Sequence, residues 1–446
     1  MKSYKKVMPI LLLIALIGSL AFTLNNRAEK HDSYQAAIAQ AREFAEKGLV
    51  KDALASYEEA LSIDPTLDTY LEVGQYYLDR EDYNGGEAWF HRLTSAFPRE
   101  AASYEYGIKL YLLRNDYNRA YETYDTYKAR RLQSEAVEAL IEPIRYRYVL
   151  AGGFQDVAVF SGSPKTAPVF NGEKWGFVET DLDEILKYRY IEAEPFSGSY
   201  AAVVDKDGNA SYIDTEGSVK INEAVILATD PEFGKVVRFQ GIQAGHILAF
   251  NGKIWNYYNS ETYAKQFGGF MEATPIGNGV GAVSLNGKDW ALIGNDGSLI
   301  TDYKYGEILR DPRNIIARAD SLIVKEGNKY YLIDKQGSRI GSTGYEKACA
   351  FYDDTYAAVY DGKQWSFVDA TGRAAIVGKF EDARSFSFNL AAVKVNGKWG
   401  YIDEKGKLAI PCEFLEAGPF STDGVAFVKV DENTWRLLKL YRYNHG

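Results

Sequence analysis

The sequence predicts a multidomain α + β protein built from an N-terminal transmembrane or signal helix, an array of helix pairs and an all-β repeat domain. Three observations predict this fold class. Residues 8–24 are almost entirely apolar; residues 34–150 show helical periodicity that repeats about every 33 residues. Residues 155–446 instead alternate between apolar and polar, and a hairpin turn recurs in them roughly every 34 to 45 residues. The 446 residues, 46% of them hydrophobic, suffice for two or three domains.

Charge and cysteine content exclude several classes of protein. The formal net charge is −10, and no Lys/Arg run follows the first residues, so a nucleic-acid groove is not expected. The only cysteines are Cys349 and Cys412, which cannot form a disulfide framework. Their spacing fits no metal site, and we expect two small buried side chains.

The first 33 residues predict a membrane anchor or a signal peptide followed by a polar linker. Lys2, Lys5 and Lys6 precede the apolar segment 8–24, which is about 26 Å long as a helix and barely spans a bilayer core. A positive flank kept inside predicts a single-pass protein of the cell membrane with the bulk of the chain outside the cytoplasm. The alternative is secretion after cleavage, because Ser19-Leu20-Ala21 has small residues at the spacing of a processing site.

Small and aromatic residues repeat through residues 34–150 at fixed positions. Each of three units has a small residue followed three positions later by a large apolar one, and then a second small residue followed four positions later by an aromatic. The small residues are Ala41, Gly74 and Gly107 in the first position and Ala53, Gly86 and Ala120 in the second. The second set is followed by Tyr57, Phe90 and Tyr124, and Pro65 and Pro98 close the first two units. Small residues at this spacing allow two helices to cross closely.

This pattern resembles the tetratricopeptide repeat, whose unit is about 34 residues long. The chain departs from that repeat in having Gly86 for the usual Ala, no closing Pro in the third unit and no consensus Trp. The resemblance implies an α-solenoid of three helix pairs over residues 34–150, with Ala136–Tyr148 as a capping helix kinked at Pro143. It also implies a concave groove lined by apolar and aromatic residues, which disfavours a clamp for carboxylate-ended peptides. The expected groove residues are Leu71, Gln75, Tyr104, Ile108 and Tyr111.

Hairpin turns and aromatic residues define the repeat of residues 155–446. Asn396-Gly397 joins two alternating segments, and Asn-Gly is the strongest hairpin signal because both central residues of a type I′ turn need positive φ. An aromatic residue follows the turn, and an acidic residue often stands four positions further on. The aligned positions are Trp175, Ala210, Trp255, Trp290, Tyr330, Trp365, Trp399 and Trp435.

The unit closely resembles the WG-containing β repeat of bacterial envelope proteins over roughly Ala158–Leu440. Only Trp175-Gly176 and Trp399-Gly400 keep the namesake dipeptide. Because the aromatic recurs in nearly every unit, we interpret these positions as a packing device, and Asp403 as the cap of the next turn. Short units must stack to bury their faces, so we expect a β-propeller of seven or eight short blades. An open β-solenoid is the alternative.

No pattern for catalysis, a metal or a cofactor stands out. The four histidines are scattered, and Asp205-x-Asp207-Gly208 fits a hairpin turn better than a calcium loop. We therefore expect a non-catalytic scaffold, anchored through residues 8–24, that binds other envelope proteins or peptides. The alternative function is binding of cell-wall glycan by aromatic-rich loops of the repeat domain; hydrolase activity would rest on fold analogy alone. Binding residues are expected in the helical groove and in two long intervals, 222–245 and 302–320.

Overall fold

The computed structural model describes residues 27–441 apart from 319 and 354. The predicted membrane segment 8–24 lies outside the described residues. Within the described part of the chain, no helix has both the length and the apolar character needed to cross a bilayer. The chain divides into two compact units after Arg145, and each is described by itself.

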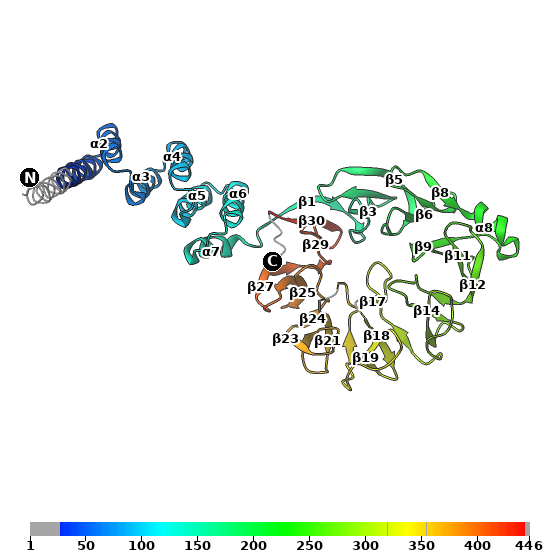
Figure 1. The fold of residues 1–446 in the computed structure, drawn as a ribbon. Helices are drawn as coiled ribbons and strands as arrows, with labels where there is room; N and C mark the ends of the chain where they lie inside the picture. Colours follow the sequence, from blue (N-terminus) through cyan, green and yellow to red (C-terminus); the bar gives the residue numbers. More distant parts are fainter. Residues whose placement is uncertain (1–26, 319, 354, 442–446) are drawn as a thin grey trace, which may run out of the picture. The chain divides into compact units, whose positions relative to one another are not determined.

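The first unit is an all-helical array in which successive helices form pairs (Figure 1). Short polar residues begin several helices: the carboxylate of Asp82 accepts a hydrogen bond from the backbone N–H of Gly85, and Asp116 from that of Arg119, at 3.0 and 3.2 Å. Residues 27–46 are also helical. The remaining helices are α2 (Val50–Ile63), α3 (Leu67–Asp79), α4 (Tyr83–Ala96), α5 (Ala101–Leu113), α6 (Tyr117–Ala129) and α7 (Glu135–Ile141).

The small repeat positions lie where helices cross. A Cβ added to Gly107 would stand 2.3 Å from the ring of Phe90, and one added to Gly74 would stand 2.8 Å from the ring of Tyr106. Ala41, Ala53 and Ala120 are fully buried. The small side chains therefore let aromatic rings of the neighbouring helix fill the crossing, as the repeat pattern predicts.

The end of the helical unit differs from the prediction. A single kinked helix was expected over Ala136–Tyr148, but α7 ends at Ile141 and a 3₁₀ turn, η1 (Glu142–Ile144), follows. Pro143 has no backbone N–H and cannot continue the α-helical ladder. The chain then enters strand β1 (Tyr148–Phe154), so the residues expected at the domain boundary, 151–154, belong to the second unit.

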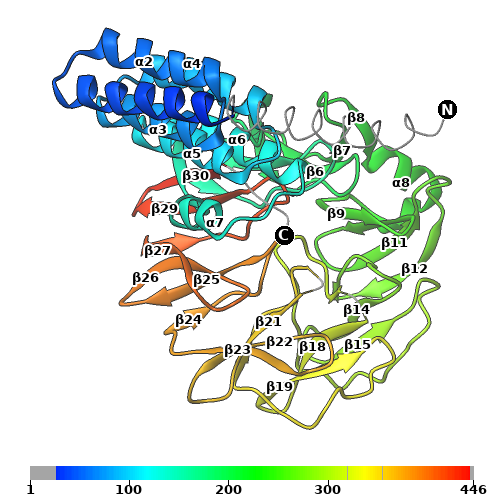
Figure 2. The same cartoon turned by 60° about the vertical axis from the view of Figure 1, so that its left-hand side comes forward.

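The second unit is all-β and consists of antiparallel sheets that follow one another around a ring (Figures 1 and 2). The first two sheets contain β2 (Asp156–Val157), β3 (Thr166–Phe170), β4 (Trp175–Glu179), β5 (Glu184–Ala193), β6 (Ala201–Asp205), β7 (Ala210–Ile213) and β8 (Val219–Asn222), then β9 (Arg238–Gln243), β10 (His246–Phe250), β11 (Trp255–Asn259) and β12 (Lys265–Phe270). The next two contain β13 (Glu272–Ala273), β14 (Gly281–Ser284) and β15 (Trp290–Ile293), then β16 (Glu307–Ile308), β17 (Ala317–Arg318), β18 (Ser321–Glu326) and β19 (Lys329–Asp334). The last three contain β20 (Lys347–Ala348), β21 (Ala357–Tyr360), β22 (Trp365–Val368) and β23 (Ala374–Gly378), then β24 (Asp382–Ala383), β25 (Leu390–Val395), β26 (Lys398–Asp403) and β27 (Leu408–Phe414), and finally β28 (Glu416–Ala417), β29 (Val425–Asp431), β30 (Thr434–Leu440) and β1.

Each repeat unit places one tight hairpin in these sheets. The ten-residue strand β5 serves two units at once, which is why β2 to β8 form one continuous sheet. The central hairpins are β3–β4, β6–β7, β10–β11, β14–β15, β18–β19, β21–β22, β25–β26 and β29–β30.

The first strand of the unit completes the last sheet. β1 runs antiparallel to β30, with Tyr148 opposite Leu440 and Phe154 opposite Trp435. Val157, further along the chain, pairs instead with Val169 in the next sheet. The first and last strands of the β unit are therefore hydrogen-bonded neighbours.

The hairpin turns are of more than one kind. At Asn396-Gly397 both residues have positive φ, 52° and 75°, as a type I′ turn requires. At Asn171-Gly172, Asn251-Gly252, Asn286-Gly287 and Asp361-Gly362 only the glycine has positive φ, and the side chain of the preceding residue stabilises the turn instead. Asn171 Oδ1, for example, accepts hydrogen bonds from the backbone N–H groups of Glu173 and Lys174 at 3.0 and 2.9 Å.

Candidate functional site in the helical unit

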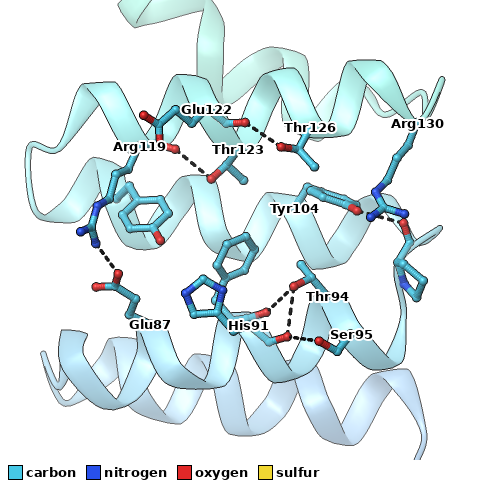
Figure 3. A pocket seen from close by; sticks show the side chains of 13 residues that line it. Glu87, His91, Thr94, Ser95, Tyr104, Arg119, Glu122, Thr123, Thr126 and Arg130 are labelled. Atoms are coloured by element: carbon cyan, nitrogen blue, oxygen red, sulfur yellow. Dashed lines mark hydrogen bonds and ion pairs between the residues drawn. The ribbon is translucent and has the colours of Figure 1, made fainter.

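A hollow of about 910 Å³ opens between α4 and α6, with α5 at its base (Figure 3). The residues that line it are Glu87, Phe90, His91, Thr94, Ser95, Pro98, Tyr104, Tyr111, Arg119, Glu122, Thr123, Thr126 and Arg130.

The floor of the hollow is aromatic and rigid. Tyr104 is 1% exposed and donates its hydroxyl to the carbonyl of Pro98 at 2.9 Å. Tyr111 stands edge-on to Phe90, with ring centroids 6.0 Å apart. Burial raises the pKa of both Tyr104 and Tyr111, so the two hydroxyls stay protonated at neutral pH. The floor is therefore a layer of packed, uncharged rings, of which little surface is exposed.

The walls carry hydroxyl groups that are held in place by their own helices. Thr123 donates to the carbonyl of Arg119 at 2.8 Å, and Thr126 to that of Glu122 at 2.9 Å. On the opposite wall, Thr94 donates to the carbonyl of Phe90 at 2.9 Å (Figure 3). Each hydroxyl already donates its proton to a carbonyl of its own helix, but its oxygen keeps lone pairs. Both walls can therefore accept hydrogen bonds from a bound chain.

The charged groups of the hollow differ between its two ends. At one end Glu87 pairs with both Arg119 and Arg114, the second contact measuring 2.7 Å. At the other end the guanidinium carbon of Arg130 lies 5.9 Å from the centroid of the Tyr104 ring. Within the described residues, no carboxylate forms an ion pair with Arg130. An incoming acidic group can therefore pair with Arg130 without displacing an internal partner.

The predicted groove residues divide into three sets. Tyr104 and Tyr111 line the hollow. Ile108 is fully buried in the core, and Leu71 is half-buried against the same core. Gln75 is exposed and donates to Asp79 at 2.6 Å. The structure thus brings two of the five together.

Sequence reasoning missed the walls of the hollow. Arg119, Thr123 and Thr126 lie in α6, the second helix of its pair, and Arg130 is its C-terminal cap, whereas the prediction used only first helices. Their spacing of three or four places them along one face of α6, and this polar stripe is the signal that could have identified them.

The repeated aromatic positions of the β unit serve packing. Trp255, Trp290, Trp365 and Trp399 are each at most 7% exposed, whereas Trp175, Tyr330 and Trp435 are half-buried. Each faces a residue across its hairpin. That partner is aromatic in the pairs Phe170–Trp175, Phe250–Trp255 and Tyr360–Trp365 and a lysine in Lys325–Tyr330, Lys394–Trp399 and Lys429–Trp435.

Steric crowding explains why a glycine follows the tryptophan in two of the units. A Cβ on Gly400 would stand 2.5 Å from the carbonyl oxygen of Ile410, and one on Gly176 would stand 2.8 Å from that of Leu186, because the next strand bulges against them. Where Asn256 replaces this glycine, the opposing strand has Gly268, whose added Cβ would meet Asn256 Oδ1 at 2.0 Å. The close approach is thus preserved when the glycine changes strand.

The two long intervals between repeat positions, 222–245 and 302–320, differ in structure. The first forms α8 (Glu223–Thr229) and the 3₁₀ turn η2 (Pro231–Phe233), whose Ile226 and Phe233 are buried in a local core. The second, between β16 and β17, reaches toward the middle of the ring (Figure 1). Across the described residues, no group of His, Cys, Asp and Glu has the arrangement of a metal site.

Comparisons with known proteins bear on the β unit. Residues 175–209, 365–399 and 399–435 match the family model described as WG containing repeat. No curated protein matches the chain. Among solved structures, the chain is similar to one described as the crystal structure of the eukaryotic initiation factor, with 12% identity, a TM-score of 0.41 and coverage of 67% of this chain and 88% of that one.

A second similar structure is the WD40 beta propeller domain of Doa1, with 9% identity, a TM-score of 0.32 and coverage of 66% of this chain and 97% of that one. The family match coincides with three of the hairpin units described above, those that begin at Trp175, Trp365 and Trp399. The chain therefore contains WG-containing repeats, at residues 175–209, 365–399 and 399–435.

Proposed function

We propose that the chain is a non-catalytic scaffold of the cell envelope whose helical unit binds an extended segment of another protein. The observation that carries the proposal is the hollow between α4 and α6, with its aromatic floor, its hydroxyl walls and the Arg130 guanidinium, which forms no ion pair among the described residues. Aromatic surface flanked by hydrogen-bond acceptors suits a peptide, which brings both side chains and backbone N–H groups.

The length of the hollow sets the size of the bound segment. Arg119 and Arg130 mark the two ends of its α6 wall, and eleven residues of α-helix rise by about 16 Å. An extended chain covers that distance in about five residues. Arg130 favours an acidic side chain at its end of the segment, because a guanidinium pairs well with a carboxylate.

Three further parts of the proposal rest on sequence and fold. We assign the helix pairs to the tetratricopeptide class, and the β unit to a closed propeller of eight short blades. The pairing of β1 with β30 supports closure, since it leaves the ring of sheets without a free end there. An extracytoplasmic location, through an anchor at residues 8–24 or after its cleavage, rests on the sequence alone.

Capture experiments with the full chain test the function. Thr126 is exposed on a wall of the hollow, so Thr126→Trp fills the hollow without disturbing the core. Lys51→Trp, at an exposed position of α2 that does not line the hollow, is the matched control. We expect a partner from cross-linked envelopes to be recovered by the wild type and by Lys51→Trp, and lost with Thr126→Trp.

Recovery of the same partners by all three proteins would contradict binding in the hollow. Retention of cell-wall polysaccharide by all three would favour the glycan-binding alternative, in which the β unit is the binding part.

A further inference from the structure

The β unit contains a hollow of about 340 Å³ beside the segment that links β16 to β17, which reaches toward the middle of the ring (Figure 1). A second hollow, of about 310 Å³, shares Pro312, Arg384 and Pro419 with the first, so the two adjoin. Together they extend from Ala348 of β20 to Val157 of β2.

Both hollows are lined mainly by apolar side chains. In the first these are Leu309, Pro312, Ala348, Ala350 and Ala392. In the second they include Val157, Val159, Phe160 and Phe427. Covering apolar surface of this kind with an apolar ligand removes it from water, which favours binding.

Two ionised side chains of the lining are neutralised inside the protein. The Asp311 carboxylate is fully buried and pairs with Arg313 at 2.6 Å and with Arg318 at 3.5 Å. The guanidinium of Arg384, which borders both hollows, pairs with Glu416 at 2.5 Å. A charged ligand would have to compete with these internal partners.

The charged end of Arg310 is also occupied elsewhere. Its guanidinium carbon lies 5.2 Å from the centroid of the Trp290 ring, and Trp290 lines neither hollow. Glu272 and Glu307, which attract this guanidinium, do not line them either. Arg310 therefore offers its charge to another part of the β unit.

The remaining polar groups of the first hollow are uncharged and engaged by the fold. Burial raises the pKa of the Cys349 thiol to about 11, so it is protonated at neutral pH. The Ser385 hydroxyl donates to the carbonyl of Cys349 at 3.4 Å and accepts the backbone N–H of Ala358 at 3.1 Å. The Ser387 hydroxyl oxygen accepts the N–H of Phe420 at 2.7 Å. An ion that entered would thus lose its water without gaining a counter-charge, which costs free energy.

We propose that the first hollow binds a small uncharged molecule, whose apolar body lies against Leu309, Ala348 and Ala350 and can extend past Pro312 into the second hollow. The volume is at the lower end of the range typical for small-molecule sites, and such sites are mainly apolar. The site lies within the β unit and does not depend on the peptide-binding hollow of the helical unit.

Three compounds that differ in charge but share one apolar body test the proposal: 2-naphthylmethanol, 2-naphthoate and 2-naphthylmethylammonium. Binding to the full chain at neutral pH is followed by ligand-observed NMR and by the thermal unfolding of the β unit. We expect 2-naphthylmethanol to bind and to raise the unfolding temperature. Each ion should bind at least about tenfold more weakly, because its charge would be buried without a partner.

A variant that fills the hollow shows where the compound binds. Ala348 is half-buried in β20, so Ala348→Leu adds apolar volume at the wall. Ala375→Leu is the matched control, since Ala375 is exposed on β23 and lines neither hollow. We expect Ala348→Leu to weaken the binding of 2-naphthylmethanol and Ala375→Leu to leave it unchanged.

Equal binding of the neutral compound and either ion by the wild type would overturn the proposal, as would no binding of the neutral compound. This comparison needs no variant, so it decides the matter even where Ala348→Leu unfolds the protein. Equal binding of 2-naphthylmethanol by the wild type and a folded Ala348→Leu would also overturn the proposal, because it would place the compound outside the hollow.

Discussion

The helical unit and the β unit use their repeated positions differently. In the helical unit, Phe90 occupies a repeat position of α4, helps to pack the core and also lines the candidate binding hollow. In the β unit, the repeated aromatics such as Trp399 are packed against neighbouring strands. A hollow of about 340 Å³ in the β unit is lined instead by residues that vary from one repeat to the next, among them Leu309 and Cys349. Repeated positions therefore contribute to the candidate binding surface of the helical unit, whereas positions that do not repeat line the hollow of the β unit.

Three Gly→Ala substitutions should sharpen this comparison, and Gly400→Ala has the largest expected effect. Its added Cβ would meet backbone atoms of β27 at 2.5 Å, which cannot move without disrupting the sheet, so we expect a loss of about 3 kcal/mol. Gly107→Ala should cost about 2 kcal/mol, because the obstacle is the Phe90 ring, which can shift. A Cβ added to Gly397 would meet no atom, so only the positive φ of this residue opposes Gly397→Ala. We expect this substitution to lower the free energy of unfolding by about 1 kcal/mol.

Chemical denaturation of the full chain, with one spectroscopic probe in each unit, measures the three values. An equal cost for Gly400→Ala and Gly397→Ala would contradict the steric explanation of the Trp-Gly pair.

Tyr401→Phe tests how neighbouring units of the β ring are linked. The buried Tyr401 hydroxyl donates to the carbonyl of Gly418, in the next sheet, at 2.8 Å. Removing it leaves that carbonyl without this donor, and we expect a loss of about 1 kcal/mol in the free energy of unfolding. Tyr257, which donates in the same way to the carbonyl of Thr274 at 2.7 Å, gives a second, equivalent substitution. No loss in either variant would show that these hydroxyls do not stabilise the contact between sheets.

Acid should affect the two units in opposite directions through two glutamates. The hydrogen bond from Arg42 lowers the pKa of Glu72 in the helical unit below 4.5, so its stabilisation is present above that pH and is lost as the pH falls through the folded-state value. In the β unit, burial raises the pKa of Glu194 above 4.5, so its ionisation opposes folding at neutral pH and this penalty is relieved as the pH falls.

Unfolding curves of Glu72→Gln and Glu194→Gln between neutral and acid pH measure these contributions. Glu72→Gln should reduce stability at neutral pH and lessen the acid loss of the helical unit. Glu194→Gln should increase stability at neutral pH. Destabilisation by both substitutions at neutral pH would contradict the assignment for Glu194.

Much of this architecture could be predicted because it repeats. The spacing of Ala41, Gly74 and Gly107 predicted the helix crossings, and the turn at Asn396-Gly397 and the cap at Asp403, which accepts the N–H of Lys405 at 2.9 Å, are confirmed. Such features depend on residues that are close in sequence or one repeat unit away, so the repeat pattern predicts them.

The features that escaped prediction depend on single residues or distant segments. Pro143 ended a helix that periodicity alone would have continued, and β1 joined the last strand of the chain across almost the whole β unit. That Arg130 has no ion pair among the described residues depends on where every nearby carboxylate lies, which no local pattern specifies.

We propose that the helical hollow, and not the repeated aromatics, receives the partner. Site-specific photo-cross-linking in intact cells tests this proposal, with p-benzoylphenylalanine at Thr126 in the hollow, at Lys51 on exposed α2 and at Trp435 among the repeat positions. We expect a discrete protein adduct from position 126 and none from positions 51 and 435. Adducts from position 435 with none from position 126 would contradict it.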